Sequence, residues 1–278
     1  MSPWFFMGLV ILGGALAWIV TAYLPRKRLA SSLSRPLPPA WLGLLEQQAL
    51  YRKLPTELQF ELQAKLKAFL HEKVFIGCDG LVVTDEMRVT IAAQACLLLL
   101  NRPTNGYPEL RWIYLFPGEF RSRIPTRDES GIVHLPDATL AGESWENGRV
   151  VLAWDSVRRG VAREDDGYNV VLHEFAHQLD QESGAADGAP LLYRREDYDA
   201  WSKVFGAAYA QLCAAIDAGE NTVIDPYGAT SPAEFFAVVT ELFYERPAAL
   251  RAEHPALYDA MVHYFRIDPA GAASYAIP

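Results

Sequence analysis

Cysteine is scarce in this chain, which has three in 278 residues. Cys78, Cys96 and Cys213 lie far apart and show no metal-ligand spacing, so neither a disulfide framework nor a cysteine metal site is indicated. The apolar run around Cys96 favours packing in a core, and the whole pattern suits a reducing compartment. Acidic residues outnumber basic residues and give a net charge of −9, so direct nucleic-acid binding is not expected.

Charge is absent from residues 4–24, which are long and apolar enough to cross a lipid bilayer as a helix. No basic residue precedes this stretch, and Arg26, Lys27 and Arg28 follow it, so the rest of the chain is predicted to lie in the cytoplasm. A cleaved signal peptide would have the opposite order of charge, and a buried core helix is the remaining alternative. The sequence therefore predicts a single-pass protein of the inner (cytoplasmic) membrane, with a bilayer anchor and basic stop at residues 1–28.

The remaining chain predicts an α+β fold, because helices come first, then a small sheet, then further helices. Residues 29–39 are rich in Ser and Pro and form a predicted linker. A helical pattern that begins at Trp41 is broken at Leu54-Pro55. The other predicted elements are a strand at 73–76, a helix capped by Thr84 or Asp85 that ends near 100, strands at 111–116 and 149–154, and helices at 197–216, 232–244 and 255–265.

The motif with the clearest chemistry is His-Glu-Phe-Ala-His at residues 173–177, in a predicted helix that begins after Asp166 and ends by Gly184. Histidines four residues apart lie on one helix face, and their neutral ring nitrogens can hold one Zn²⁺. Glu174 would then lie near a water that the metal activates. The alternative is a pair of surface histidines on an amphipathic helix, which the apolar residues around the motif disfavour.

A third metal ligand must come from elsewhere in the chain, because Asp180 and Ser183 stand where a longer His-x-x-Gly-x-x-His pattern needs its glycine and histidine. A carboxylate from a later helix is favoured. Glu196 lies in a crowded charged segment that also suits a solvated helix start. Glu234 lies in a mostly apolar helix, where it also fits a capping box. Spacing alone leaves these two glutamates equal.

Two further carboxylates lie close to these positions in helical spacing. Asp180 follows His177 by three residues, so it could orient a ring N–H or simply lie at the surface near the helix end. Glu241 lies seven residues after Glu234 on nearly the same helix face. It could support the metal site or form an ordinary ion pair. The sequence leaves both roles open.

Three blocks of the chain resemble the Mlc titration factor A (MtfA) family of zinc metallopeptidases: GESWENGRVVLAWDSV, VVLHEFAHQLD and IDPYGATSPAEFFAVVTELFYERP. The resemblance covers about residues 40–268 and leaves 269–278 as a tail. It implies a gluzincin-like domain, similar to the catalytic domain of anthrax lethal factor. It also implies one zinc ion on His173, His177 and Glu234, Glu174 as general base and Tyr227 near the metal. The apparent membrane helix is not a general feature of that family.

The expected function is therefore a zinc metallopeptidase that acts on peptides or proteins, with aminopeptidase action as one form. A second hypothesis is a membrane-tethered protein that sequesters a transcriptional repressor or another partner, as the family's named role implies. A third is a small-molecule metallohydrolase. Glu174 favours catalysis, because a structural zinc site needs no base and usually closes with four protein ligands.

A substrate-binding edge is expected beside this motif. The predicted strand at 149–154 precedes the motif helix and could hold an extended peptide by main-chain hydrogen bonds. Trp145 and Trp154 would then lie near the cleft, although packing in the core suits both equally. Tyr227 could donate a hydrogen bond to the oxyanion that develops during hydrolysis.

Overall fold

The computed structural model describes residues 36–102, 106–121, 126–127, 133–134, 139–140, 142–145, 148–163 and 165–271. The chain divides into two compact units, Met1–Pro39 and Ala40–Pro278. The predicted membrane helix at residues 4–24 lies outside the described ranges and stays a prediction. Within those ranges, no helix combines the length and the apolar character needed to span a bilayer.

Helices begin the described part of the chain, as the sequence predicts. They are α3 (Pro39–Glu46), α4 (Ala49–Arg52) and α5 (Thr56–Glu72). The predicted break is confirmed, because α5 begins directly after Pro55, a residue that cannot donate a helical N–H. Helix α5 buries a stripe at helical spacing, which includes Leu58, Leu62 and Leu66.

Helix α6 (Asp85–Leu97) is capped by Thr84, whose hydroxyl accepts a hydrogen bond from the backbone N of Met87 at 3.3 Å. Of the two caps that the sequence allows, Thr84 is therefore the one used, and Asp85 lies in the first turn. The α-helix ends at Leu97, a few residues before the predicted end. Cys96 is fully buried in this helix, which confirms its predicted packing role.

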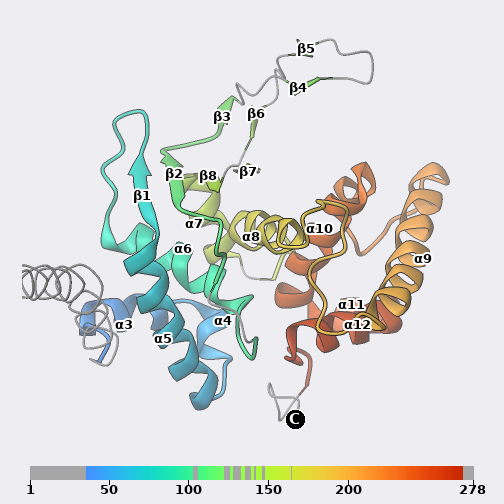
Figure 1. Ribbon diagram of the computed structural model, residues 1–278, viewed down its shortest axis with the longest axis horizontal. Helices are drawn as coiled ribbons and strands as arrows, with labels where there is room; N and C mark the ends of the chain where they lie inside the picture. Colours follow the sequence, from blue (N-terminus) through green and yellow to red (C-terminus); the bar gives the residue numbers. More distant parts are fainter. Residues whose placement is uncertain are drawn as a thin grey trace, which may run out of the picture. The chain divides into compact units, whose positions relative to one another are not determined.

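A four-stranded sheet in the order β1-β2-β8-β7 follows these helices (Figure 1). Its strands are β1 (Val74–Gly77), β2 (Trp112–Phe116), β8 (Arg149–Ala153) and β7 (Gly142–Trp145). β1, β2 and β8 run parallel, whereas β7 pairs antiparallel with β8 and places Gly142 opposite Leu152. Two further pairs join β3 (Phe120–Arg121) to β6 (Thr139–Leu140) and β4 (Thr126–Arg127) to β5 (Val133–His134).

The position of β8 corrects one prediction. The strand at 149–154 was expected to offer an exposed edge, but β8 has β2 on one side and β7 on the other. Among the described strands, β1 and β7 form the two edges, and β7 is the edge strand next to β8. The predicted strand is also one residue too long, because Trp154 begins helix α7 (Trp154–Ala162), which the sequence analysis did not predict.

Helix α8 (Val170–Gln181) carries the His-Glu-Phe-Ala-His motif, as predicted. Its predicted cap is wrong: the Asn169 side chain accepts from the backbone N atoms of Val171 and Leu172, each at 3.1 Å. Asp166 instead accepts from the backbone N of Tyr168 in the preceding turn, at 3.0 Å. Gly184 lies just beyond the helix end with a φ of 85°, a conformation that glycine adopts easily.

Further helices complete the fold and confirm the predicted helices at 197–216, 232–244 and 255–265. They are α9 (Asp197–Asp217), the short 3₁₀ helix η2 (Pro226–Thr230), α10 (Pro232–Glu245), α11 (Pro247–Glu253) and α12 (Pro255–Phe265). Pro232, Pro247 and Pro255 each open a helix, where the missing N–H has no intrahelical partner to lose. Helix α11 was not predicted.

Helix α10 is buried from Phe235 to Glu245 because other helices cover it on more than one side. One face packs against α8 (Figure 1), and another meets aromatic side chains of α9, with the rings of Trp201 and Phe236 centred 5.9 Å apart. Carboxylates on such a helix need polar or charged partners. Three of them, Glu234, Glu241 and Glu245, find these partners on α8 and the segment before it.

Candidate metal centre

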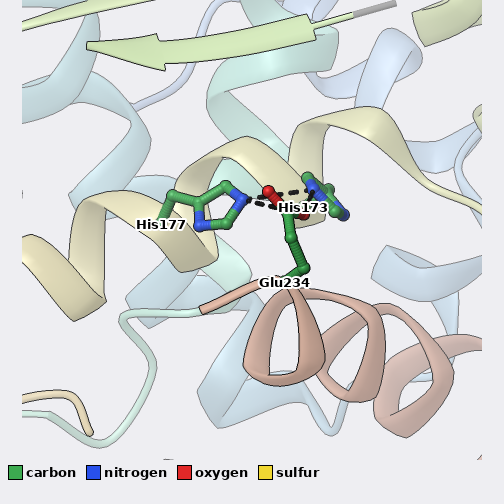
Figure 2. A group of neighbouring side chains, drawn as sticks. All are labelled: His173, His177 and Glu234. Carbon is green, nitrogen blue, oxygen red and sulfur yellow. Dashed lines mark hydrogen bonds and ion pairs between the residues drawn. The ribbon is translucent and has the colours of Figure 1, made fainter. Parts of the chain in front are cut away.

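Two elements bring the predicted metal ligands together. His173 and His177 lie one turn apart on α8, and Glu234 reaches them from the first turn of α10 (Figure 2). The Nε2 atoms of the two histidines are 3.2 Å apart, and Glu234 Oε2 lies 3.0 Å from His173 Nε2 and 3.4 Å from His177 Nε2. The three side chains are partly exposed, so the group is open to solvent.

A cation suits this group because of the chemistry of its atoms. Glu241 Oε1 lies 2.8 Å from His173 Nδ1, and a carboxylate can only accept, so in the neutral ring Nδ1 carries the proton and Nε2 offers its lone pair. Lone pairs of His173, His177 and Glu234 therefore converge within 4.8 Å of one another. A positive charge between them relieves their repulsion, and two imidazoles with a carboxylate are ligands that zinc accepts.

The charges of the metal-free group follow the same geometry. Burial lowers the pKa of His173, but Glu241 and Glu234 outweigh it and raise that pKa well above its usual value. Burial raises the pKa of Glu234, yet its hydrogen bonds with His173 and His177 prevail and hold the pKa at about 2. The site therefore attracts positive charge, whether a proton or a metal ion.

Glu174 lies beside the ligand group and is only 5% exposed. Its Oε2 atom is buried and has no hydrogen-bond partner among the described residues. Burial raises its pKa to about 7, although His173 and His177 oppose the shift. A buried carboxyl without a partner is costly, so its retention beside a candidate metal site points to a chemical role.

Comparison with known proteins assigns the chain to a family. The family described as glucose-regulated metallo-peptidase M90 matches residues 24–266. This chain belongs to that family. The resemblance predicted from the three sequence blocks is thereby confirmed, and the M90 match includes the His-Glu-Phe-Ala-His motif and Glu234.

Individual relatives match most of the chain. An uncharacterized protein of Synechocystis sp. (strain ATCC 27184 / PCC 6803 / Kazusa) is 44% identical over 237 residues, which cover 84% of this chain and 86% of the relative. Mlc titration factor A of Pectobacterium atrosepticum is 33% identical over 219 residues, with 78% and 82% covered. Mlc titration factor A of Klebsiella pneumoniae subsp. pneumoniae is 33% identical over 214 residues, with 76% and 80% covered.

A cleft of about 320 Å³ opens beside the candidate metal centre. Its lining joins α8, the edge strand β7 and η2, and includes Gly142, Tyr168, Val170, His173, Glu174 and Tyr227. Tyr227 is 51% exposed, and its ring centre lies 6.0 Å from that of His173. Tyr227 therefore lies close to His173, and its role beside a metal stays a prediction.

The two tryptophans, Trp145 and Trp154, were also predicted to lie near the cleft. Trp154 is not among the residues that line this cleft in the described part of the chain. The side chain of Trp145 lies outside the described residues. Tyr168, which the sequence analysis did not select, lines the cleft and is 42% exposed.

Glu196, the competing third ligand, lies away from the metal centre. It precedes α9 as an exposed residue and pairs with Arg194, so its interpretation as a solvated helix start is correct. Glu241 is 3% exposed and holds His173, which makes it part of the site. Asp180 is fully buried, so a surface role is wrong for it. It accepts a hydrogen bond from the backbone N of Gly188 at 2.9 Å.

Gly142 is a further site residue, and its replacement by Ala is expected to lower activity without loss of metal. A Cβ at this position would lie 2.5 Å from Glu174 Oε1 and 2.7 Å from Val170 Cγ2, so Glu174 must move. A displacement of about 1 Å at a catalytic group can lower the rate by about 100-fold. Peptide turnover and zinc content of the Gly142→Ala protein test this.

Gly206 provides the matched control for Gly142. It lies within α9, and an added Cβ there would meet no atom within 4 Å. Gly206→Ala should leave turnover unchanged and slightly raise stability, since Ala favours a helix interior by about 1 kcal/mol over Gly. Equal turnover in the Gly142→Ala and Gly206→Ala proteins would refute a role for Gly142.

Asp180→Asn is expected to change how stability depends on pH. Burial raises the pKa of Asp180 to about 6, from 3.8 for the exposed group. The folded state therefore holds this proton more tightly, and the associated stability is present below pH 4 and is lost as pH rises through 6. Asn has no such proton, so the variant should gain about 1–3 kcal/mol relative to wild type between pH 4 and 7.5. Urea unfolding at both pH values measures the difference, and a constant difference would contradict it.

Proposed function

We propose that this chain is a zinc-dependent peptidase of the gluzincin type, with His173, His177 and Glu234 as metal ligands and Glu174 as general base. The observation that carries the proposal is the buried Glu174 carboxyl beside three convergent ligands, with Oε2 left without a hydrogen-bond partner among the described residues. The described residues offer three ligands at this group rather than four, as in catalytic zinc sites that keep one position open.

The chemistry requires the chain's own residues at three points. A zinc ion held there would lower the pKa of water and polarise the scissile carbonyl. Glu174 would accept the proton of the attacking water and deliver it to the leaving amine. Tyr227, half-exposed in the cleft, would donate its hydroxyl hydrogen to the developing oxyanion; burial raises its pKa to about 12, so the hydroxyl stays protonated near neutral pH. Glu241 would keep the His173 ring in one tautomer.

An extended peptide fits this proposal at the β7 edge. β7 pairs with β8 on one side, and Gly142 lies in the cleft lining close to Glu174. Main-chain groups on the other side of β7 could pair with a substrate strand, which would carry its scissile bond past Glu174. This arrangement does not depend on substrate sequence, so it accommodates both internal cleavage and removal of N-terminal residues.

Sequestration of a regulatory protein is the second candidate function. It is favoured by the relatives named Mlc titration factor A, which match more than three quarters of this chain. In such a protein the zinc would hold the fold or the binding surface, and Glu174 would have no proton to transfer. Hydrolysis of small molecules is the third candidate, and the open cleft alone does not distinguish it from peptide cleavage.

Metal removal and restoration test the proposed activity. We expect the purified full-length chain to cleave a mixed peptide library, to lose this activity when a chelator removes the metal, and to regain it with about one zinc per chain. Mass spectrometry of the products gives the cut sites and distinguishes removal of terminal residues from internal cleavage. A panel of esters, assayed in parallel, measures hydrolysis of small molecules.

The three functions give different results in this experiment. Zinc-dependent cleavage of peptides supports the proposal. Zinc binding without cleavage of any peptide contradicts it and favours sequestration of a partner. Cleavage of esters alone favours the small-molecule hydrolase, and failure to bind zinc overturns the metal site itself.

A further inference from the structure

Asn169, just before the metal-binding helix α8, uses every polar group that it has. Its side-chain oxygen caps the helix, and its carbonyl accepts from the backbone N of His173 at 2.9 Å. Its backbone N–H donates to Glu241, and its side-chain NH₂ donates to Glu245 Oε1 at 3.0 Å. The residue is 1% exposed. One side chain therefore connects the start of α8 with two buried carboxylates on α10.

Glu245 has no evident role in the proposed reaction, yet it is buried. It is 5% exposed, and its Oε2 accepts from the backbone N of Gly167 at 3.0 Å. Within the described ranges, no Lys or Arg forms an ion pair with Glu241 or Glu245. Burial raises the pKa of Glu245 to about 8, because the ionised carboxyl loses contact with water. A well-packed apolar residue would be easier to accommodate there, so the carboxyl needs another explanation.

The connections of Glu241 suggest that explanation. Its Oε1 holds His173 Nδ1 at 2.8 Å, while its Oε2 accepts from the backbone N of Asn169. The direction of the His173 ring thus depends on the Glu241 carboxylate, and the Glu241 carboxylate depends on Asn169. Asn169 in turn is fixed on its other side by Glu245. Replacement of the groups that orient a metal-binding histidine commonly lowers metal affinity by about 10–100-fold.

We propose that Asn169 and Glu245 are positioning residues for the metal centre, which fix Glu241 so that His173 directs Nε2 toward the metal. The chain Glu245–Asn169–Glu241–His173 runs through three buried residues and ends at a proposed metal ligand. This inference rests on the proposed metal site. It concerns affinity for the metal rather than the peptidase reaction, so zinc binding can test it without any substrate.

Reciprocal substitution tests the proposed pair. Asn169→Asp keeps the capping oxygen but sets a carboxylate against Glu245. Glu245→Gln directs an NH₂ group either at the NH₂ of Asn169 or at the backbone N–H of Gly167. In the double variant, the Gln NH₂ donates to the Asp carboxylate and the Gln oxygen accepts from Gly167. The bond between positions 169 and 245 thus returns with donor and acceptor exchanged, and the bond from Gly167 is kept.

Zinc affinity of the full-length chain is measured by competition with a chromophoric chelator. We expect each single variant to bind zinc about 10–100-fold more weakly than wild type, and the double variant to recover most of that loss. Single variants that bind zinc as tightly as wild type, or a double variant no better than the weaker single, would overturn the proposal. If wild type itself binds no zinc, the proposed function fails instead, so the two failures are distinguishable.

Two further variants distinguish a positioning role from a purely structural one. The first removes a comparable helix cap elsewhere, and the second changes Asn169 in another way. Thr84→Ala removes the cap of α6, which contributes no residue to the candidate metal group, and should lower the melting temperature without a change in zinc affinity. Asn169→Ser keeps a capping oxygen and removes only the donor to Glu245, so it serves if the charged variant fails to fold. Weaker zinc binding and an altered visible spectrum of bound Co²⁺ in Asn169→Ser support positioning, and unchanged affinity and spectrum overturn it.

Discussion

Glu174→Gln is expected to lower peptide turnover by about 10²–10⁴-fold while zinc binding stays intact. Gln has nearly the same shape as Glu, but its amide cannot accept the proton of the attacking water. Glu174 is not one of the three residues whose ligand atoms converge, so the substitution leaves those ligands in place. Turnover and zinc content, measured on the same sample, separate these two effects.

The stability of the same variant provides an internal control. Burial raises the pKa of Glu174 to about 7, so the ionised carboxyl is unfavourable in the folded state. A neutral Gln removes this cost, and the metal-free variant should melt at the same temperature as wild type or higher. Loss of turnover with equal or greater stability cannot come from unfolding.

Glu220→Gln is the matched surface change, because Glu220 is exposed beyond the end of α9. It should leave turnover, zinc content and melting temperature unchanged. Turnover of the Glu174→Gln protein close to that of wild type would overturn the general-base mechanism. It would leave the metal site itself standing, since metal content is measured separately.

Local patterns in the sequence predict the helices well, because the signals that start them are local. Pro55 and Thr84 mark helix starts through a missing N–H and a hydroxyl cap, and the structure uses both. The cap of α8 shows the limit of this reasoning. Asp166 and Asn169 are equally good capping residues, and only the contacts of Asn169 with Glu241 and Glu245 decide between them. Those contacts join residues far apart in the sequence.

The prediction that the strand at 149–154 forms an exposed sheet edge was wrong for the same reason. The strand at 149–154 is apolar and short, which its sequence shows, but which strands flank it depends on the whole topology. β7 contains Gly142, and a glycine within a strand often marks a close approach of another group. The sequence analysis predicts no strand at 142–145, so the contact of Gly142 with Glu174 could be found only in the structure.

Within the candidate site, too, the residues that are close in sequence could be predicted and the distant ones could not. His173 and His177 are four residues apart on one helix, so their common face follows from helical geometry alone. Glu234 and Glu196 could not be distinguished by spacing, and the family resemblance favoured Glu234. The structure places Glu234 3.0 Å from His173 Nε2 and leaves Glu196 exposed. Glu245 was missed, although a Glu four residues after Glu241 in an apolar helix signals a buried carboxyl.

Glu234→Ala is expected to lower zinc affinity by about 10²–10³-fold, since zinc-site binding energies of about 10–16 kcal/mol are shared among three or four ligands. The truncation removes the carboxylate that lies against both histidines. It keeps the start of α10, because Ser231 caps that helix through the backbone N of Glu234 at 3.2 Å. Zinc competition measures the affinity, and unfolding in a chelator confirms that the variant still folds.

Glu196→Ala is the control that the chain itself offers, because sequence spacing gave these two glutamates equal standing. Its exposed side chain pairs only with Arg194 among the described residues, so zinc affinity should match that of wild type. Zinc should raise the melting temperature of wild type and of Glu196→Ala, because ligand binding to the folded state stabilises it, and should raise that of Glu234→Ala much less. The opposite pattern would move the third ligand to Glu196, and equal affinity in all three proteins would remove a glutamate from the metal site altogether.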